Sequence, residues 1–402
     1  MKARRAVIFG AGNVGRGFLG HLLHRSGYRL TFVDVDRQLV AAIKEIGGYR
    51  LRLAYPDHDE QVVIAPVDAL LAEDATHVCQ VLTEAEVAVT AVGARALPAI
   101  APLIAEGLRL RRSTRLDAPL NVIICENLRD AATVLRREVE SHLPRDLHPY
   151  MAEHLGLVMS VIGRMVTQPR SEELAQDGTL VVAEPYWRLP VDRAGFKGPI
   201  PPIEGLEPYT PFSPWVDRKL FLHNAGHAVL AYLGHLRGHE VGWQAVTDAS
   251  VRPCVRRAME ESSRALAAEH GFALDELQRD ADELMVRFAN PRLNDPITRL
   301  ARDPMRKLAS DDRLVGAARL CLRHGVEPDA LAWGIAAALC YDDPTDASAQ
   351  ELQQRLRERG LEETLADVCG LAETEPLASM VTERYRALLR GDWPVMAEEA
   401  SR

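Results

Sequence analysis

Three polar side chains of different chemistry stand close together in the segment DRKLFLHNAGHA, residues 217–228. If the segment is helical, each residue advances by about 100°, so Asn224 lies about 140° and His227 about 80° from Lys219. An amine, an amide and an imidazole then project from one side of the helix, and such groups can exchange protons and donate hydrogen bonds. The same face could instead be a solvated surface, and the spacing alone leaves both interpretations open.

The surroundings of this polar face favour burial. His223 falls in the same sector, about 40° from Lys219, while leucine, phenylalanine, valine and tyrosine residues flank the segment. A helix that is apolar nearly all round is usually buried, and its polar groups then need partners. Gly226 stands inside the predicted helix, where glycine costs stability. We therefore expect a ligand or another backbone to approach this position closely.

A second group of residues has the pattern of a phosphate-binding turn. GAGNVG, residues 10–15, follows the apolar run 6–9 and precedes a helical pattern. In such a turn Gly10 permits the tight bend, Gly12 lets the backbone approach a pyrophosphate, and Gly15 lets the helix pack close to the strand. The free N–H groups at the helix N-terminus then favour the anion. The alternative is a glycine turn that binds no nucleotide.

The acid that a dinucleotide site needs is Asp34. It ends the second predicted strand, 19 residues after Gly15. A carboxylate there can accept both ribose hydroxyls of NAD and would repel the 2′-phosphate of NADP. We therefore predict NAD as the cofactor. Asn13 and Arg16 lie beside the phosphates in this interpretation, or they are solvated residues at the helix start.

The elements that must position these residues differ between the two halves of the chain. In the first half, apolar strand patterns alternate with helical patterns, which predicts a parallel sheet covered on both faces. The predicted strands cover 6–9, 30–33, 87–92 and 121–125, and the predicted helices cover 14–25, the stretch that ends near 110, and 129–142. The runs 156–162 and 179–184 also look like strands that extend the sheet.

From about residue 215 only helical patterns occur. They cover 217–236, 251–269, 274–288, 311–324, 328–341, 347–358 and 375–390. Gly271 and Gly360 are expected to end helices, and Ser213 or Asp217 to begin the one that carries Lys219. The proline-rich stretch 199–214 breaks the pattern. The predicted fold class is therefore α/β, with a Rossmann-type dinucleotide-binding domain over 1–200 and an all-helical domain over 201–402.

Bulk composition excludes several classes of protein. The 402 residues carry a net charge of −9, which argues against a nucleic-acid or anionic-membrane binder. The six cysteines are scattered without a metal-binding spacing, which indicates reduced structural thiols. No apolar run approaches the roughly 20 residues of a membrane span, and the N-terminus lacks a signal-peptide core. We therefore expect a cytoplasmic protein.

The spacing Lys-x4-Asn-x2-His is the hallmark of the polyol-specific long-chain dehydrogenases, and Lys219, Asn224 and His227 match it. The chain resembles this family over nearly its whole length. The similar stretches are GAGNVGRGFLGHLL, FVDVD, TAVG (90–93), CENLRD (125–130), KLFLHNAGHA (219–228) and RKLASDDRL (306–314). The motif identifies the family strongly and the substrate only weakly.

The resemblance implies a role for each residue of the motif. Lys219 would be the general base for the alcohol proton, with its pKa lowered by desolvation and by the nicotinamide cation. Asn224 would hydrogen-bond the developing alkoxide, and His227 would bind and orient the reacting oxygen. Asn127 matches a family asparagine that assists Asn224. Hydride passes to NAD, so no metal is expected.

The resemblance also implies the reaction, which is reversible oxidation of D-mannitol 1-phosphate to D-fructose 6-phosphate. The alternative is an unphosphorylated polyol or hexonate. The expected partner is thus a small sugar phosphate or polyol, with no nucleic acid or membrane, and the chain is expected to be a monomer or weak dimer. The phosphate candidates are Arg164, Arg287, Arg306 and Lys307, with Asn290 nearby, although the more ordinary interpretation of each is a helix-surface or interdomain ion pair.

Two positions depart from the family pattern. His223 stands where an apolar or small residue is expected, and Gly163 where an acid is expected.

Three other kinds of protein are alternative interpretations of the sequence. Gly238-His-Glu-Val-Gly resembles part of the motif of zinc polyol dehydrogenases, but its glycine spacing is short by one. Dehydrogenases of 3-hydroxyacids or glycerol 3-phosphate also join a dinucleotide fold to helices, with a different Lys-to-Asn spacing. An NAD-sensing module would need no lysine on a buried face.

Overall fold

The computed structural model describes residues 4–114 and 117–394, which form two compact units, Met1–Val216 and Asp217–Arg402. The boundary predicted at 200/201 falls inside the first unit, because strand β12 (Leu206–Tyr209) pairs in parallel with β11 (Leu189–Asp192). Among the described residues, none of the helices combines the length and the apolar character that a membrane crossing requires.

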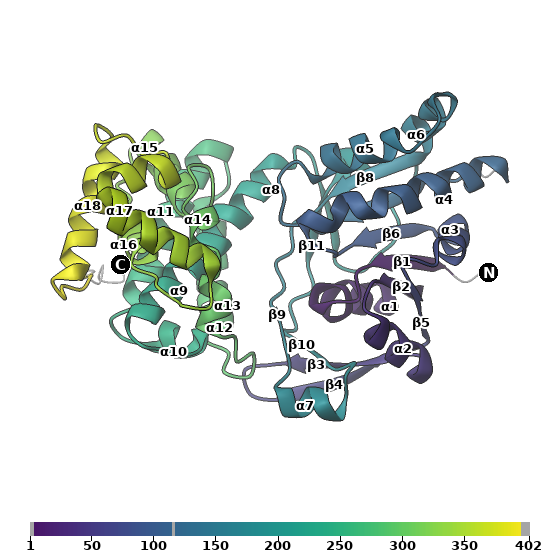
Figure 1. Cartoon of the computed structure of the whole chain (residues 1–402), viewed down its shortest axis with the longest axis horizontal. Helices are drawn as coiled ribbons and strands as arrows, with labels where there is room; N and C mark the ends of the chain where they lie inside the picture. Colours follow the sequence, from purple (N-terminus) through teal and green to yellow (C-terminus); the bar gives the residue numbers. More distant parts are fainter. Residues whose placement is uncertain (1–3, 115–116, 395–402) are drawn as a thin grey trace. The chain divides into compact units, whose positions relative to one another are not determined.

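The first unit is built on a six-stranded parallel sheet with the order β5-β2-β1-β6-β7-β8 (Figure 1). Its strands are β1 (Arg5–Phe9), β2 (Arg29–Asp34), β5 (Val67–Leu71), β6 (Val87–Thr90), β7 (Leu120–Ile124) and β8 (Leu155–Met159). The predicted parallel sheet is confirmed, and β8 extends it at one edge. When the six strands of this sheet are numbered in chain order, their order across the sheet is 3-2-1-4-5-6, which is that of a Rossmann fold.

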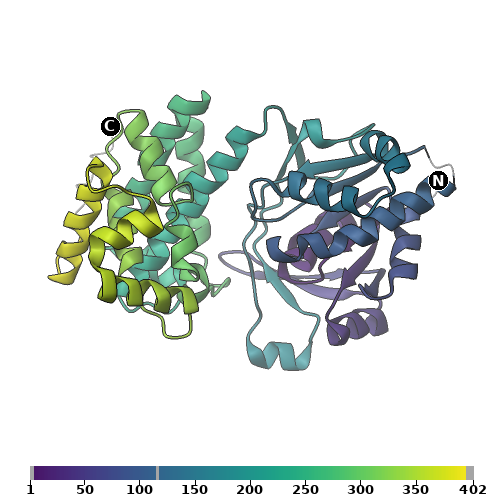
Figure 2. The ribbon, with the colours of Figure 1, turned by 45° about the horizontal axis from the view of Figure 1, so that its top comes forward.

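Side chains alternate between the two faces of this sheet and build two separate cores. Ala6 and Ile8 of β1 pack with η1 (Gly15–Gly20), α1 (His21–Arg25) and α2 (Arg37–Ile46). Val7 and Phe9 pack on the opposite face with α3 (Ala75–Glu84), α4 (Ala101–Ser113), α5 (Ala131–Ser141) and α6 (His148–His154). Figures 1 and 2 show α4 and α5 together on one side of the sheet. Burial on both faces explains why the strands are nearly continuous apolar runs.

A second sheet of four strands was not predicted. Its order is β4-β3-β10-β9, with β3 (Tyr49–Ala54), β4 (Asp59–Ile64), β9 (Val166–Thr167) and β10 (Val181–Ala183). The expectation that residues 179–184 extend the main sheet is therefore wrong, because β10 pairs with β3 and β9 instead. This sheet covers η1, and a side chain added at Gly17 would meet Val166 at 2.5 Å.

The second unit is entirely helical in the described residues, as predicted. Its longer helices are α9 (Ala225–Leu236), α11 (Arg252–His270), α12 (Leu274–Phe288), α15 (Val315–Arg323), α16 (Asp329–Leu339), α17 (Ala347–Cys369) and α18 (Pro376–Leu389). The shorter ones are α10 (Gly242–Thr247), α13 (Ile297–Ala301) and α14 (Pro304–Lys307), while α8 (Ser213–Arg218), which begins at a predicted cap, spans the sequence boundary between the units. Gly271 ends α11 in the left-handed conformation, and the backbone breaks at Gly360 (φ 82°) inside α17.

The core of the second unit forms around α9, where glycines let helices approach closely. A Cβ at Gly226 would lie 2.7 Å from Met259 of α11, and one at Gly334 of α16 would lie 2.5 Å from Val229. The expectation that a ligand or a backbone approaches Gly226 is therefore wrong, since a methionine side chain fills that space. Each fully buried Leu or Val on α9 contributes on the order of 2 kcal/mol to stability.

A buried glutamate ties α11 to the first turn of α16. Glu261 is fully buried, and its two oxygens accept from Ala330 N (2.9 Å) and Leu331 N (3.1 Å). Burial raises the pKa of Glu261 to about 7 from an ordinary value of 4.5. The native state therefore holds a proton that the unfolded chain releases between these two values.

This raised pKa predicts a pH dependence of stability. The contribution of Glu261 is complete below pH 4.5 and is lost as pH rises through 7. The loss is on the order of 3 kcal/mol. Denaturant unfolding at pH 5 and pH 8 should show the helical unit weakening with pH, and Glu261→Gln should flatten that difference. An equal slope in the variant would contradict the assignment.

Candidate active site

The glycine turn joins β1 to η1 at the carboxyl edge of the main sheet. Gly10 adopts φ 96° and donates from its N–H to Val33 O at 2.8 Å. A side chain at Gly10 would overlap Ala91 O, and one at Gly15 would overlap Gly10 O. Nothing lies within 4 Å of a Cβ built at Gly12, which is exposed. Two glycines thus permit close packing, and the third leaves an open backbone for a pyrophosphate to approach.

Asp34 at the end of β2 contacts the turn directly. Its Oδ2 accepts from Ala11 N at 2.5 Å, and its Oδ1 accepts from Asp36 N at 2.9 Å. The carboxylate is half-buried, and each oxygen retains a further lone pair. Asp34 can therefore hold the turn and accept ribose hydroxyls at the same time.

Arg16 is not the solvated residue that one of the two interpretations expected. It is buried, its Nε donates to Ala11 O at 2.6 Å, and its Nη1 donates to Thr179 O. The guanidinium thus fastens the glycine turn to the second sheet, and Tyr49 adds a hydrogen bond from its hydroxyl to Arg16 O at 2.7 Å. Asn13 is half-buried at the start of the helix.

The dual contact of Asp34 predicts a split between two substitutions. Asp34→Asn keeps an acceptor for Ala11 N, loses the acceptor for Asp36 N, and removes the charge that repels a 2′-phosphate. The ratio of kcat/KM for NADP to that for NAD should rise by about 10–100-fold. Asp34→Ala also removes the acceptor, so its kcat/KM should fall with both cofactors. Steady-state kinetics with each cofactor tests this, and an unchanged ratio in Asp34→Asn would contradict it.

The loop after β7 carries the other residues expected in this unit. Asn127 is exposed two residues beyond Cys125, at the edge where ligands of such sheets bind. The preceding residue, Glu126, is buried and accepts hydrogen bonds from Val92 N and Gly93 N. Gly163 lies where an acid was expected, and a Cβ there would meet the Tyr186 ring at 2.9 Å.

In the second unit, Lys219 and Asn224 are directly bonded. Lys219 Nζ donates to Asn224 Oδ1 at 2.5 Å. The backbone from Lys219 to Asn224 is a π-helical turn, η5, in a helix that runs from α8 into α9. A π turn closes between residues five apart, so it brings the amine and the amide together. The angle of about 140° expected for a regular helix is therefore wrong.

Two imidazoles complete this polar face. His227 stacks on Phe288 of α12 at 4.4 Å, and His223 meets the edge of the same ring at 5.7 Å. Burial lowers the pKa of both histidines well below the usual value, and the charge of Lys219 lowers it further. Both rings are thus neutral at pH 7, and each can donate one hydrogen bond and accept another. His223 lies deeper than His227.

The residues just before Lys219 are anchored to neighbouring helices. Arg218 is buried, its Nε donates to Asp280 at 2.8 Å and its Nη1 donates to Glu276 at 2.7 Å, both on α12. Asp217 contacts His270 at the end of α11 at 3.0 Å. These contacts were not predicted, although the pair Asp217-Arg218 directly precedes the lysine in the sequence. They fix the start of the π turn and hence the direction of Lys219.

The phosphate candidates have contacts of their own. Arg164 is buried, where its Nε donates to Glu184 O at 2.6 Å and its Nη1 meets His21 Nδ1 at 3.1 Å. In the second unit, Arg306 pairs with Asp303 at 2.9 Å. Lys307 is buried and donates to a backbone carbonyl. Arg287 lies 3.8 Å from Glu283, and Asn290 accepts from Arg292 N at 3.0 Å.

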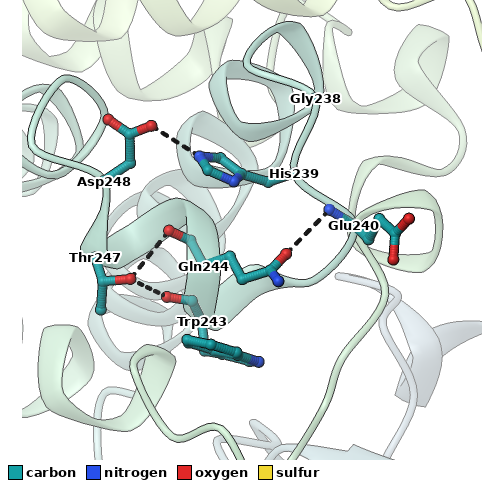
Figure 3. A pocket seen from close by; sticks show the side chains of 7 residues that line it. All are labelled: Gly238, His239, Glu240, Trp243, Gln244, Thr247 and Asp248. Atoms are coloured by element: carbon teal, nitrogen blue, oxygen red, sulfur yellow. Dashed lines mark hydrogen bonds and ion pairs between the residues drawn. The ribbon is translucent and has the colours of Figure 1, made fainter.

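The segment that resembled a zinc motif lines a separate open surface pocket of about 460 Å³ (Figure 3). There His239 Nε2 contacts Asp248 at 2.8 Å, and Gln244 accepts from Glu240 N at 3.3 Å. Throughout the described part of the chain, no three His, Cys, Asp or Glu side chains are grouped as a metal site would require. The histidine of this segment thus stabilises the turn between α9 and α10.

Comparison with known proteins identifies relatives over the whole length of the chain. A mannitol-1-phosphate 5-dehydrogenase of Brevibacillus brevis is 38% identical over 384 residues, which is 95% of this chain and 98% of that protein. A protein of the same name from Bacillus subtilis (strain 168) is 38% identical over 380 residues, 94% of this chain and 99% of that protein.

Solved structures share the fold at lower identity. Pseudomonas fluorescens mannitol 2-dehydrogenase, in a ternary complex with NAD and D-mannitol, superposes with a TM-score of 0.77 at 20% identity, over 97% of this chain and 93% of that one. A substrate-free D-sorbitol dehydrogenase gives 0.79 at 18% identity, over 96% and 93%. Residues 4–205 match the mannitol dehydrogenase Rossmann domain, and residues 212–389 match the mannitol dehydrogenase C-terminal domain. The chain therefore belongs to the mannitol dehydrogenase family.

Proposed function

We propose that this chain is an NAD-dependent oxidoreductase that interconverts D-mannitol 1-phosphate and D-fructose 6-phosphate. The observation that carries the substrate is the 38% identity to two mannitol-1-phosphate 5-dehydrogenases over 94–95% of the chain. The observation that supports the chemistry is the hydrogen bond between Lys219 and Asn224. An unphosphorylated polyol is the second candidate, and the fold shared with mannitol 2-dehydrogenase is compatible with it.

In the proposed mechanism, Lys219 removes the proton of the substrate hydroxyl that becomes the ketone. An amine does this only when it is unprotonated. NAD, when bound, would supply the acceptor for the hydride that leaves the carbon bearing this hydroxyl. Asn224 holds Lys219 through its carbonyl oxygen, which leaves its NH₂ group to donate to the alkoxide as negative charge develops there.

His227 binds and orients the reacting oxygen in this proposal. Because its pKa is lowered well below the usual value, the neutral ring can donate a hydrogen bond to that oxygen without adding a charge beside the amine. Asn127 in the first unit is proposed to assist Asn224. The residues that fit NAD are Gly10, Gly12, Asn13, Gly15 and Asp34, since the backbone is open at Gly12 and an acid ends β2.

The substrate assignment predicts a strong preference between two ketoses. NADH oxidation should be at least about tenfold more efficient in kcat/KM with D-fructose 6-phosphate than with D-fructose, because charge-assisted hydrogen bonds to a phosphate are strong. Initial rates at matched concentrations measure this, with D-glucose 6-phosphate as a control for nonspecific phosphate effects. Equal efficiencies for the two ketoses would favour the unphosphorylated polyol instead.

The assembly and location of the chain stay as proposals. We propose a monomer or weak dimer in the cytoplasm that acts on a small molecule. Light scattering on a size-exclusion column at two protein concentrations tests the first part. A stable tetramer that does not dissociate on dilution would contradict it.

A further inference from the structure

Glu126 is a buried acid that the proposed chemistry does not use. It follows β7, and only 8% of its surface is exposed. One carboxylate oxygen accepts from Val92 N and the other from Gly93 N, both at 2.9 Å. Its negative charge is thus balanced by two successive peptide N–H groups, as in an anion-binding turn.

The segment held by Glu126 supports the glycine turn. Ala91 N donates to Phe9 O at 2.7 Å, which ties the end of β6 to the end of β1. A Cβ at Gly10 would overlap Ala91 O and would lie 3.1 Å from Val92 N. The glycine turn therefore packs at Gly10 directly against the peptide between Ala91 and Val92. Gly93, the last residue that Glu126 holds, has φ 89°, so the chain turns sharply there.

Strand order indicates which half of a dinucleotide this segment faces. In a sheet of this order, each half binds one mononucleotide, and the two halves meet beside the first strand. Asp34 ends β2 on one side of β1, the side of the adenosine ribose. β6 and β7 lie on the other side of β1. The segment 91–93 and Glu126 therefore stand at the nicotinamide half.

We propose that Glu126 is a positioning residue for the nicotinamide half of NAD. It holds the backbone N–H groups of Val92 and Gly93. The peptide between Ala91 and Val92, which packs against Gly10, is thereby also held in place. Glu126 also sets the start of the loop that carries Asn127. This inference rests on the proposed function only in taking NAD as the cofactor.

The geometry makes glutamine a discriminating replacement. A glutamine side chain has the same shape, but it offers one acceptor oxygen and an NH₂ group that would face an N–H. Glu126→Gln should therefore release one of the two peptides. Glu261 provides a matched control, because it is also buried and accepts from two successive backbone N–H groups, in the helical unit. Glu126→Asp is the conservative variant, which keeps the charge.

The experiment measures NADH binding by fluorescence and KM for NAD and for D-mannitol 1-phosphate. In Glu126→Gln, the Kd for NADH and the KM for NAD should rise by about 10–100-fold, while KM for the polyol phosphate changes by less than about threefold. Glu126→Asp should recover part of the loss. Glu261→Gln should leave NADH binding unchanged, although it alters stability.

Two results would overturn the inference. One is NADH binding by folded Glu126→Gln within about twofold of the unsubstituted protein. The other is an equal loss of binding in Glu261→Gln, because a general effect on folding would then explain both. If circular dichroism shows that Glu126→Gln does not fold, Glu126→Asp is compared with the unsubstituted protein instead. Unchanged NADH binding by Glu126→Asp would then overturn the inference. If the unsubstituted protein binds NADH but does not oxidise D-mannitol 1-phosphate, only the proposed function fails.

Discussion

Replacing Lys219 by alanine is expected to lower kcat by about 10²–10⁴-fold, which is the usual contribution of a positioned general base. NADH binding should persist, since the residues that fit the cofactor lie in the other compact unit. Asn224 would lose its hydrogen-bond partner, but the helix is held by Arg218 and Asp217, so the variant should fold. Stopped-flow or steady-state reduction of NAD, together with NADH fluorescence, measures both quantities.

Lys219→Arg is the more informative companion. Arginine keeps the positive charge and can still donate to Asn224, but it stays protonated at all accessible pH values. If Lys219 acts as a base, this variant should be as inactive as the alanine variant. Lys44→Ala, which changes an exposed lysine on α2, should be fully active. Near-normal turnover by either Lys219 variant at neutral pH would refute the assignment of the base.

Replacing Asn224 by alanine is expected to lower kcat by about 10²–10³-fold, because removal of one donor to a developing oxyanion costs about that much. The substitution also removes the Asn224 acceptor of the Lys219 amine. Asn224→Asp keeps an acceptor for Lys219 and places a negative charge beside it. An adjacent negative charge stabilises the protonated form of an amine, so the pH profile of kcat should move towards alkaline pH.

The two asparagine variants thus separate two roles of one side chain. Measurement of kcat from pH 6 to pH 10 distinguishes a uniform loss, expected for alanine, from a displaced profile, expected for aspartate. If Asn224→Asp has an unshifted profile and full activity, two roles are refuted: the NH₂ group as a donor to the alkoxide, and position 224 as an influence on the protonation of Lys219.

The fold could be predicted from sequence wherever one local rule decided the outcome. The strand 6–9, the glycines at 10, 12 and 15, and Asp34 follow each other at a spacing that a single βαβ unit requires. The starts of the longer helices of the second unit were predicted within a few residues, because apolar periodicity and stop signals such as Gly271 agree there, but α17 continues past the predicted stop at Gly360 to Cys369.

Other features depend on contacts that are distant in sequence. The pairing of β10 with β3 joins residues about 130 positions apart. The sequence of β10, which is three buried apolar residues, would fit the main sheet as well as the second sheet. Arg16 resembled a solvated residue at a helix start, yet it bonds to a carbonyl of Thr179. The alternation in YRLRLA, residues 49–54, was a signal for β3 that could have been used.

The Lys219–Asn224 hydrogen bond could not be predicted from residue types, since it depends on the pitch of the backbone. Motif spacing predicted both residues as members of one site, and their side chains are in contact. A regular helix, however, would have separated the amine and the amide, and nothing in the letters KLFLHN distinguishes the two kinds of helix.

The π-helical turn has a consequence for how this segment can vary. Four residues separate the amine of Lys219 from the amide of Asn224, and the wider π turn accommodates all four: Leu220, Phe221, Leu222 and His223. Side chains there can be exchanged for others of similar volume, but a deletion of one residue would tighten the coil and swing the amine away from the amide. In this segment the count of residues is therefore constrained more strictly than their identity.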